Sequence, residues 1–186
     1  MDVAKVIEKR RAYRSLDPDP LTEQDLAQLE KAIQLTPSCF NNQPWRYVFV
    51  TDAEKRKEMQ TVLSDGNSWA HYASMYVAVC ARKDDDCVIH DREYYLFDAG
   101  LATGFLILQA TDLGFVAHPI AGYSPKKTRG VLNIPDDMQV IALVIVGKHR
   151  DTIRSELSEK QVQAEQKRPL RKPIEEIIHY DQYSKR

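Results

Sequence analysis

The chain has 186 residues, of which 43% are hydrophobic and 28% are charged, and its formal net charge is −1. This length fits one domain with a sizeable core, and the composition is ordinary for a soluble globular protein. A nearly neutral chain gives no support for general attraction to nucleic acids or membrane surfaces. No apolar run approaches the roughly 18–20 residues of a membrane span.

The cysteines and the N-terminal segment indicate the compartment. Cys39, Cys80 and Cys87 form neither a Cys-x-x-Cys pair nor an even set for disulfides, so we expect reduced thiols. The N-terminal sequence MDVAKVIEKRR has the pattern of an amphipathic helix and lacks an apolar signal core. Both features predict a cytoplasmic protein.

The first third of the chain alternates between helical patterns and proline-containing breaks. Thr22 and Asp25 have the spacing of a capping box, in which each side chain satisfies a backbone amide of the same helix end. The LDPDPL segment before them enforces an extended link. The expected elements are helices from Asp2 to about Ala12, from Thr22 to Pro37 and over Ala53–Leu63, and a strand over Tyr47–Thr51.

The middle of the chain has one long, unusually apolar helical pattern between short apolar runs. Its apolarity and small residues favour a central core helix, which Gly114 ends. Pro125 suits the first turn of a later helix. The expected elements are strands over Met75–Ala81, Phe115–Ile120 and Gln139–Val146, and helices from about Arg92 to Leu113 and over Ser124–Leu132.

The last segment, residues 149–186, turns polar and charged and is predicted to be an arm of the single domain 1–186. It ends in a short element that carries Ile174, Ile177 and Ile178. Apolar side chains beyond a polar arm need a surface to bury them. We expect a partner subunit to provide that surface.

The segment Pro37–Val50, PSCFNNQPWRYVFV, is the first sign of a specific ligand. Asn41 and Gln43 can be simple turn formers, and Trp45 can be a core residue. The same residues can instead present amides, backbone N–H groups and a flat ring to a planar polar ligand. Their position directly before an alternating apolar strand favours the second interpretation.

Two basic clusters lie near opposite ends of the sequence. Lys9-Arg10-Arg11 ends the first helical pattern, with Arg14 one turn on, and cations there are favourable for the helix dipole alone. The alternative is a phosphate clamp, because the arginine fork binds two oxygens at once. Lys167-Arg168 and Arg171-Lys172 form the second cluster, which can equally be a solvated run.

Other candidate chemistry is weak. The chain has no GxGxxG after a strand and no Walker loop, and its five histidines lack metal-ligand spacing. Cys39 has no placed histidine base that would make it a nucleophile. Asp84-Asp85-Asp86 is most simply a solvated loop, and Glu175-Glu176 is surface charge.

Taken together, the motifs resemble those of the nitroreductase family of FMN-dependent oxidoreductases, in the family's order and over nearly the whole chain. The matching segments are KRRAYRSL, PSCFNNQPWRYVFV with its Ser-x-x-Asn-x-Gln-Pro-Trp pattern, DAGLATGFLILQATDLGF, HPIAGY and LRKPIEEIIHYDQY. Each motif is moderately specific, and five in order are strong.

The resemblance implies a set of FMN-binding residues. It assigns the phosphate to the N-terminal arginines and the C-terminal basic pair, the ring and ribityl to the Pro37 loop of the second subunit, and flavin N5 and O4 to the loop after the central helix. The implied residues are Arg10, Arg11, Ala12, Arg14, Pro37, Ser38, Cys39, Asn41, Asn67, Pro119, Ile120, Ala121, Gly122, Arg171 and Lys172.

Two positions depart from the family pattern. Ala12 stands where a serine commonly contacts the phosphate, so one hydroxyl is missing from the phosphate-binding set. His118 stands before Pro119 where smaller residues are common, and it can narrow the pocket or titrate near the flavin.

The implied fold is α+β, with a mixed, mostly antiparallel sheet flanked by helices on both faces and a C-terminal arm that embraces the partner of a homodimer. The implied reaction is ping-pong hydride transfer from NADH or NADPH, through flavin N5, to a nitroaromatic, quinone or similar acceptor. No protein side chain is expected to act as the catalyst, because the flavin carries the chemistry. The alternatives are a specialised flavin enzyme, such as a dehalogenase or enone reductase, and a non-catalytic flavin-binding module.

Overall fold

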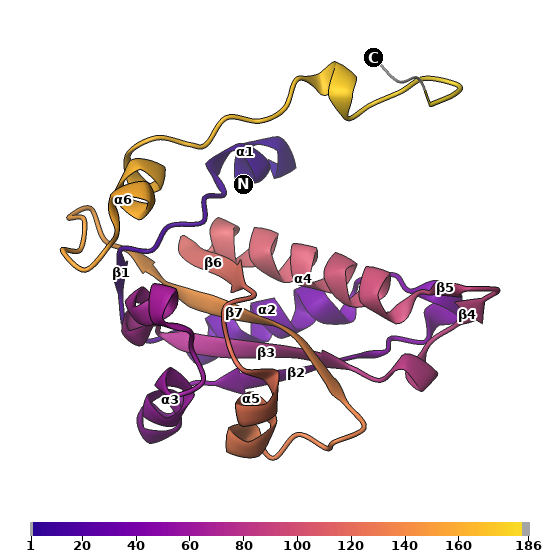
Figure 1. Cartoon of the computed structure of the whole chain (residues 1–186), viewed down its shortest axis with the longest axis horizontal. Helices are drawn as coiled ribbons and strands as arrows, with labels where there is room; N and C mark the ends of the chain where they lie inside the picture. The colour runs from indigo at the N-terminus through magenta and orange to yellow at the C-terminus, as the bar shows by residue number, and fades with distance from the viewer. Residues whose placement is uncertain (1, 184–186) are drawn as a thin grey trace.

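The computed structural model describes residues 2–183 as an α+β fold around one antiparallel sheet (Figure 1). Every strand pair among the described residues is antiparallel, whereas the sequence analysis expects a mixed, mostly antiparallel sheet. The strands are β1 Leu16–Asp17, β2 Trp45–Val50, β3 Met75–Ala81, β6 Phe115–Ile120 and β7 Gln139–His149, with a separate hairpin of β4 Val88–Ile89 and β5 Arg92–Glu93.

Strand β7 is the centre of the sheet. Residues 143–146 of β7 pair with both β3 and β6, so these two strands lie on opposite edges of β7. Strand β2 lies outside β3, and β1 pairs with the end of β7 through Leu16 and His149. Both β3 and the centre of β7 are fully buried, as their continuous apolar sequences predict.

The helices begin and end largely where local sequence signals place them. Asp2 accepts a hydrogen bond from the Ala4 amide, and Thr22 and Asp25 form the expected capping box. Gly114 follows the long helix with φ 80°. The helices are α1 Val3–Lys9, α2 Glu23–Gln34, α3 Ala53–Gln60, α4 Tyr95–Asp112, α5 Pro125–Leu132 and α6 Glu159–Gln166, with 3-10 turns η1 Cys39–Asn41, η2 Asp65–Tyr72, η3 Lys83–Asp85 and η4 Ile174–Glu176.

Several boundaries differ from the predicted ones, and the structure explains two of them directly. Helix α1 ends at Lys9 instead of about Ala12, because residues 10–15 extend to reach β1. Helix α4 begins at Tyr95 instead of about Arg92, because Arg92 pairs with Ile89 in the β4–β5 hairpin.

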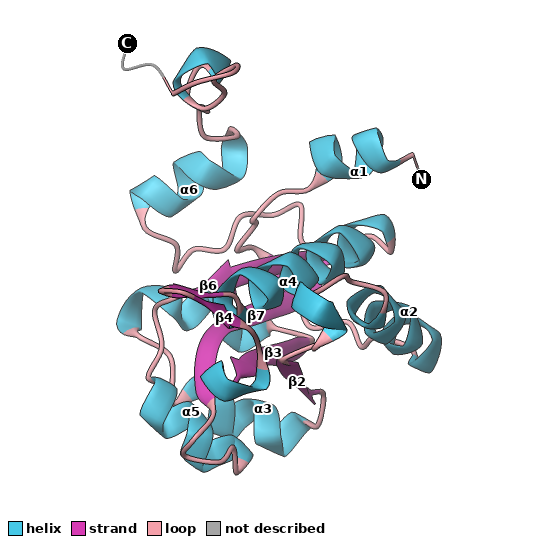
Figure 2. Cartoon of the chain, turned by 90° about the vertical axis from the view of Figure 1, so that its right-hand side faces the viewer, coloured by secondary structure: helices cyan, strands magenta, loops and turns pink. Residues whose placement is uncertain are grey.

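Helices cover both faces of the sheet, as the sequence analysis expects (Figures 1 and 2). On one face, Leu29 of α2 and Leu106 of α4 pack against β3 and β7. On the other face, Met59 of α3 and Trp69 of η2 pack against the same strands. Helix α4 is the expected core helix on its sheet side, although Phe97 is 65% exposed on its other side.

The C-terminal segment divides into an anchored part and an extended part. Helix α6 is tied to residues 11–15 by hydrogen bonds. Beyond α6 the chain stands away from the sheet and its covering helices in both views, and Ile174, Ile177 and Ile178 are exposed (Figures 1 and 2). None of the helices within residues 2–183 is long and apolar enough to cross a membrane.

Candidate functional site

The two basic clusters from opposite ends of the sequence lie together. The Arg168 guanidinium donates to the backbone oxygen of Arg10 at 3.0 Å and to that of Glu8. Burial lowers the pKa of Arg10, and repulsion from Arg168, Arg171 and Arg11 lowers it further. We call Arg10, Arg168 and Arg171 the cationic cluster. Within residues 2–183 no carboxylate forms an ion pair with any of these three arginines. Unpaired cations in this arrangement favour an anion.

Arg11 has a different task from its neighbours. Its guanidinium donates to the backbone oxygens of Ala164 at 2.8 Å and Glu165 at 3.2 Å, and lies over the Tyr13 ring at 4.6 Å. These carbonyls belong to the C-terminal end of α6, where a cation also interacts favourably with the helix dipole. The fork of Arg11 is therefore used in docking α6.

Glu165 fixes the backbone that carries Arg14. It is 7% exposed, and its carboxylate accepts from the amides of Arg14 at 2.6 Å and Ser15 at 3.1 Å. Sequence reasoning missed this residue, because a glutamate in a polar arm carries no signal of burial. Burial lowers the pKa of Arg14, and the Glu165 charge opposes this shift.

A continuous set of contacts leads from Arg14 to the loop after β6. The Arg14 guanidinium lies 5.8 Å from the Trp69 ring centre, and Trp69 Nε1 donates to Asn67 Oδ1 at 3.1 Å. Asn67 Nδ2 in turn donates to the Gly122 oxygen at 2.8 Å. The structure thus brings Asn67 and Gly122 together with the arginines, and adds Trp69, which sequence reasoning did not single out.

The loop after β6 has the open backbone that a planar ligand needs. A Cβ atom on Gly122 would collide with the Asn67 side-chain amide, so any larger residue at this position would displace that amide. Within the described chain the amides of Ala121 and Gly122 donate to no protein acceptor. Ala121 is exposed and Gly122 is half-buried, so both N–H groups are available to a ligand.

His118 lies two residues before Ile120 on β6 and contacts Trp69 and Tyr13. Its ring stacks on Trp69 with 4.8 Å between centroids, and Nδ1 lies 3.1 Å from the Tyr13 oxygen. Burial, with a further contribution from Arg14, lowers its pKa to about 4. The ring is therefore neutral near pH 7, and Nδ1–H donates to the carbonyl oxygen, which argues against titration of His118 near neutral pH.

The remaining predicted residues of this region make fewer contacts that bear on a ligand. Pro119 is exposed on β6, whereas Ile120 is buried in the core below the loop. Ala12 is half-buried in the link between α1 and β1. Lys172 is exposed, and its Nζ lies 3.9 Å from a Glu176 carboxylate oxygen.

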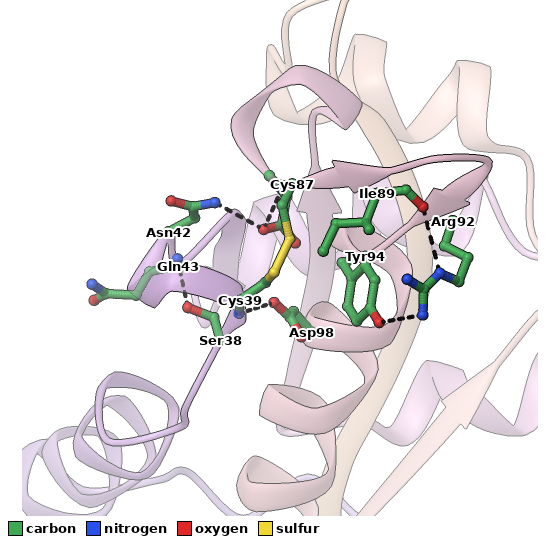
Figure 3. The surroundings of a disulfide bond; sticks show 10 residues. Ser38, Cys39, Asn42, Gln43, Cys87, Ile89, Arg92, Tyr94 and Asp98 are labelled. Atoms are coloured by element: carbon green, nitrogen blue, oxygen red, sulfur yellow. Dashed lines mark hydrogen bonds between the residues drawn. A yellow bond between two sulfur atoms is a disulfide. The ribbon is translucent and has the colours of Figure 1, made fainter.

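The loop of residues 37–43 lies elsewhere, beside the first turn of α4 and the β4–β5 hairpin (Figures 1 and 3). The Cys39 amide donates to Asp98 at 2.7 Å, and the Gln43 amide donates to Ser38 Oγ at 2.9 Å. Phe40 and Asn41 have φ values of 46° and 59°, in the left-handed region. Trp45, directly after the loop, is 7% exposed, so it is a core residue and not the flat ring for a ligand that the sequence analysis favoured.

The expectation that all cysteines are reduced is wrong for two of them. Cys39 and Cys87 form a disulfide with their Cα atoms 6.4 Å apart, and Cys80 is free and buried (Figure 3). The β4–β5 hairpin folds back onto the loop of residues 37–43 and brings these two cysteines together. Their separation of 48 residues gives no hint of this pairing.

The interpretation of Asp84–Asp86 as a solvated loop is wrong for Asp86. Asp86 is 9% exposed, and its Oδ1 accepts from the Asn42 side chain at 3.2 Å and from the Cys87 amide at 2.8 Å. Asp98 is 2% exposed, and burial raises its pKa, with Asp86 raising it further. We call Asp86 and Asp98 the acidic pair.

The predicted site residues thus form two groups within one chain. One group joins the cationic cluster to Asn67 and the loop after β6. The other is the loop of residues 37–43, where a cavity of about 610 Å³ opens between α2 and β2, lined in part by Asn42, Gln43 and Arg46. No residue that lines this cavity belongs to the first group.

Comparisons with known proteins find similarity in sequence and in fold. The sequence profile of the Nitroreductase family matches residues 7–68. An Archaeoglobus fulgidus protein with the provisional name NADH dehydrogenase/NAD(P)H nitroreductase is 29% identical over 79% of this chain and 85% of its own. The FMN reductase [NAD(P)H] of Bacillus subtilis is 25% identical over 81% of this chain and 67% of its own.

A solved structure described as an oxidoreductase containing FMN matches the fold over 97% of this chain and 92% of its own, with a TM-score of 0.84 and 29% identity. The motifs, the fold and these relatives agree. The chain is similar to proteins of the nitroreductase family in the sequence of residues 7–68 and in its fold.

Proposed function

We propose that the protein is an FMN-dependent oxidoreductase that takes electrons from NADH or NADPH and passes them to a conjugated acceptor. The observation that carries this proposal is the cationic cluster, which continues through Arg14, Trp69 and Asn67 to the open amides of the loop after β6. The names of the relatives, FMN reductase and NAD(P)H nitroreductase, support the same cofactor and donor.

The residues present fit FMN. A phosphate carries close to two negative charges. Arg10 and Arg171 offer cationic donors that form no ion pair with a described carboxylate, and Arg14 adds a third cation near Glu165. Each such charged hydrogen bond contributes about 1.5–3 kcal/mol, and less where the arginine is exposed. The missing hydroxyl at Ala12 removes one neutral donor and leaves these cations in place.

The pyrimidine edge of a flavin carries carbonyl oxygens and ring nitrogens. The free amides of Ala121 and Gly122 suit these acceptors, and Asn67 holds the loop in position by donating to the Gly122 oxygen. Bound FMN would supply the redox chemistry between the nicotinamide donor and the acceptor. The protein's part is to bind, orient and hydrogen-bond, which agrees with the absence of an expected acid, base or nucleophile in the motifs.

We infer further that the protein works as a homodimer in which the loop of residues 37–43 covers the flavin of the partner subunit. Within one chain this loop lies apart from the cationic cluster, beside Asp98. Exposed apolar side chains on α1, α4 and the C-terminal segment support an extensive subunit interface; they include Val3, Ile7, Phe97, Phe105, Leu170, Ile174 and Ile177.

The experiment is a spectroscopic cycle on the purified protein. We expect a yellow protein with an FMN-like spectrum that NADH or NADPH bleaches without oxygen and that menadione restores. A colourless protein that does not take up added FMN would contradict the whole assignment. A yellow protein that neither nicotinamide reduces would leave FMN binding intact and contradict the proposed donor. A screen of nitroaromatics, quinones, enones and halogenated aromatics against the reduced protein then identifies the acceptor class.

A further inference from the structure

Four groups with metal-binding chemistry gather at the first turn of α4, apart from the cationic cluster, and one of them, Cys39, belongs to the loop of residues 37–43. One carboxylate oxygen of Asp86 and the sulfur atoms of Cys39 and Cys87 all lie within 4.8 Å of one another. Asp98 borders this group, because its Oδ2 accepts from the Cys39 amide and its charge interacts with that of Asp86. The ligand atoms come from three separate segments of the chain (Figure 3).

The acidic pair lacks a compensating cation. Asp86 and Asp98 are 9% and 2% exposed, and within residues 2–183 neither forms an ion pair with a lysine, arginine or histidine. The side-chain amide of Asn42 and the backbone N–H groups of Cys39 and Cys87 donate hydrogen bonds to them. Among residues 2–183 no donor group satisfies the buried Asp86 Oδ2, and the Asp98 carboxyl lies close enough to share a proton with the Asp86 carboxyl. A buried carboxylate oxygen in this state is costly unless a proton or a metal ion satisfies it.

From this arrangement we propose that the reduced protein binds a divalent zinc-like ion through Cys39, Cys87 and Asp86, with Asp98 or a water molecule as the fourth ligand. Two thiolates favour zinc and other borderline or soft ions over magnesium and calcium. Zinc–sulfur bonds are about 2.3 Å and zinc–oxygen bonds about 2.0–2.2 Å, so the ligands of one ion lie about 3.5–4 Å apart in a tetrahedron.

The disulfide is the metal-free, oxidised form of the same site. A dithiol reductant opens it by thiol–disulfide exchange, which reduces the two sulfur atoms to thiols and oxidises the reductant to its own disulfide. The two thiols then lose two protons as they bind the ion. Each sulfur can bond either to the other sulfur or to the metal ion. Oxidation to the disulfide therefore releases the metal, and metal binding protects the thiols from oxidation. The proposal does not depend on FMN.

The test uses the full-length protein reduced without oxygen by a dithiol, freed of the reductant, and titrated with Zn²⁺ or Co²⁺ alone. We expect one ion per chain, and with Co²⁺ the visible bands of a tetrahedral site together with thiolate-to-cobalt charge-transfer absorption. The oxidised protein should bind neither ion stoichiometrically. Zn²⁺ should also protect Cys39 and Cys87 from alkylation, read by peptide mass spectrometry.

Variants assign the ligands. Cys39→Ser and Cys87→Ser should each abolish the charge-transfer band of a two-thiolate site, and Asp86→Asn should weaken Zn²⁺ binding at least about 10- to 100-fold. Cys80→Ala removes the third thiol, which lies in the core, and should leave the metal stoichiometry unchanged. Circular dichroism checks folding, and the alkylation measurement on the unchanged protein stands if a variant does not fold.

Three results would overturn the proposal. The first is reduced wild-type protein that takes up no stoichiometric Zn²⁺. The second is Co²⁺ binding without thiolate absorption, and the third is Zn²⁺ affinity that is the same in Cys87→Ser as in the wild type. None of these results bears on FMN binding, so the two proposals fail separately.

Discussion

Two regions of this protein concentrate charge in opposite ways. Arg10, Arg168 and Arg171 gather near α6 with no acidic partner within residues 2–183, whereas Asp86 and Asp98 lie buried at the start of α4 with no basic partner there. Folding alone would pair such charges, because unpaired like charges repel and buried ones lose hydration. Uncompensated charge of each sign is therefore a mark of ligand binding, with an anion expected at the first region and a cation at the second.

The regions also differ in how they are held. The cationic cluster is fixed by side chains that hydrogen-bond to backbone across long sequence separations, such as Arg168 to Arg10 and Glu165 to Arg14. The acidic pair is enclosed by a covalent link between Cys39 and Cys87. Substitutions in each region should change stability or flavin binding in the way that its charge and its contacts require.

The largest expected effect is on the pH dependence of stability. His118 has a folded pKa of about 4 against an ordinary value of 6.5, so between these values the unfolded chain binds a proton that the folded chain does not. Stability should therefore fall as the pH drops from about 6.5 to about 4, by up to about 3 kcal/mol from this residue. Denaturant unfolding of wild type and His118→Gln over this range measures the difference. His71→Gln, at an exposed position, should follow the wild type. Equal slopes in all three proteins would contradict the buried neutral ring.

The next effect concerns the loop after β6. Gly122→Ala should destabilise the fold by about 1–3 kcal/mol, because the new methyl group displaces the Asn67 amide and breaks its bonds to Gly122 and Trp69. Gly130→Ala on α5 meets no atom within 4 Å and should stabilise by about 0.5–1 kcal/mol. Urea unfolding of the two variants gives the comparison. Equal stability changes in the two variants would contradict the close contact between Gly122 and the Asn67 side chain.

A third prediction separates phosphate binding from ring binding. Arg10→Gln should weaken FMN about tenfold, the lower end of the loss expected for one charged hydrogen bond. Riboflavin lacks the phosphate, so its affinity should stay at the wild-type level. Lys5→Gln removes an exposed cation from α1 and should leave both affinities unchanged. Fluorescence titration of both flavins measures this, and an equal loss for riboflavin would exclude a phosphate role.

The smallest effect is expected at the loop of residues 37–43. Asn41→Ala should weaken FMN about fivefold by removing one neutral hydrogen bond, and only in the dimer. Because Asn41 has φ 59°, Asn41→Gly keeps the backbone relaxed and isolates the loss of the amide. Sedimentation and FMN titration of the same samples give assembly and affinity together. A stable monomer with full FMN affinity would show that this loop does not cover a partner's flavin.

The sequence predicts the elements well where local signals agree. The strand Met75–Ala81 matches the predicted range at both ends, and the capping box of Thr22 and Asp25 forms as expected. Apolar periodicity and caps are encoded within a few residues, so they can be read without the fold. Helix α4 starts later than predicted because Arg92 and Glu93 pair with Ile89 and Val88 in the short β4–β5 hairpin, which the sequence analysis did not predict.

The site is harder to predict than the elements. Glu165, Trp69 and Asp86 have sequence contexts typical of a solvated arm, a turn and an acidic loop, and only the packing of distant segments buries them. The Cys39–Cys87 pairing likewise depends on a hairpin that carries no cysteine motif. The family resemblance supplies the list of basic and loop residues. Only the three-dimensional contacts show that Arg11 binds the end of α6 while Arg10 forms no ion pair with a described carboxylate.

The docking of α6 affects the order in which the parts of the chain fold. The amides of Arg14 and Ser15 emerge from the ribosome about 150 residues before the Glu165 carboxylate that accepts from them. Contacts so distant in sequence form late, because a long loop must close before they contribute. The corner that we assign to the flavin phosphate is therefore completed last, and a chain that stops before α6 would keep its sheet core yet lack the support for Arg14.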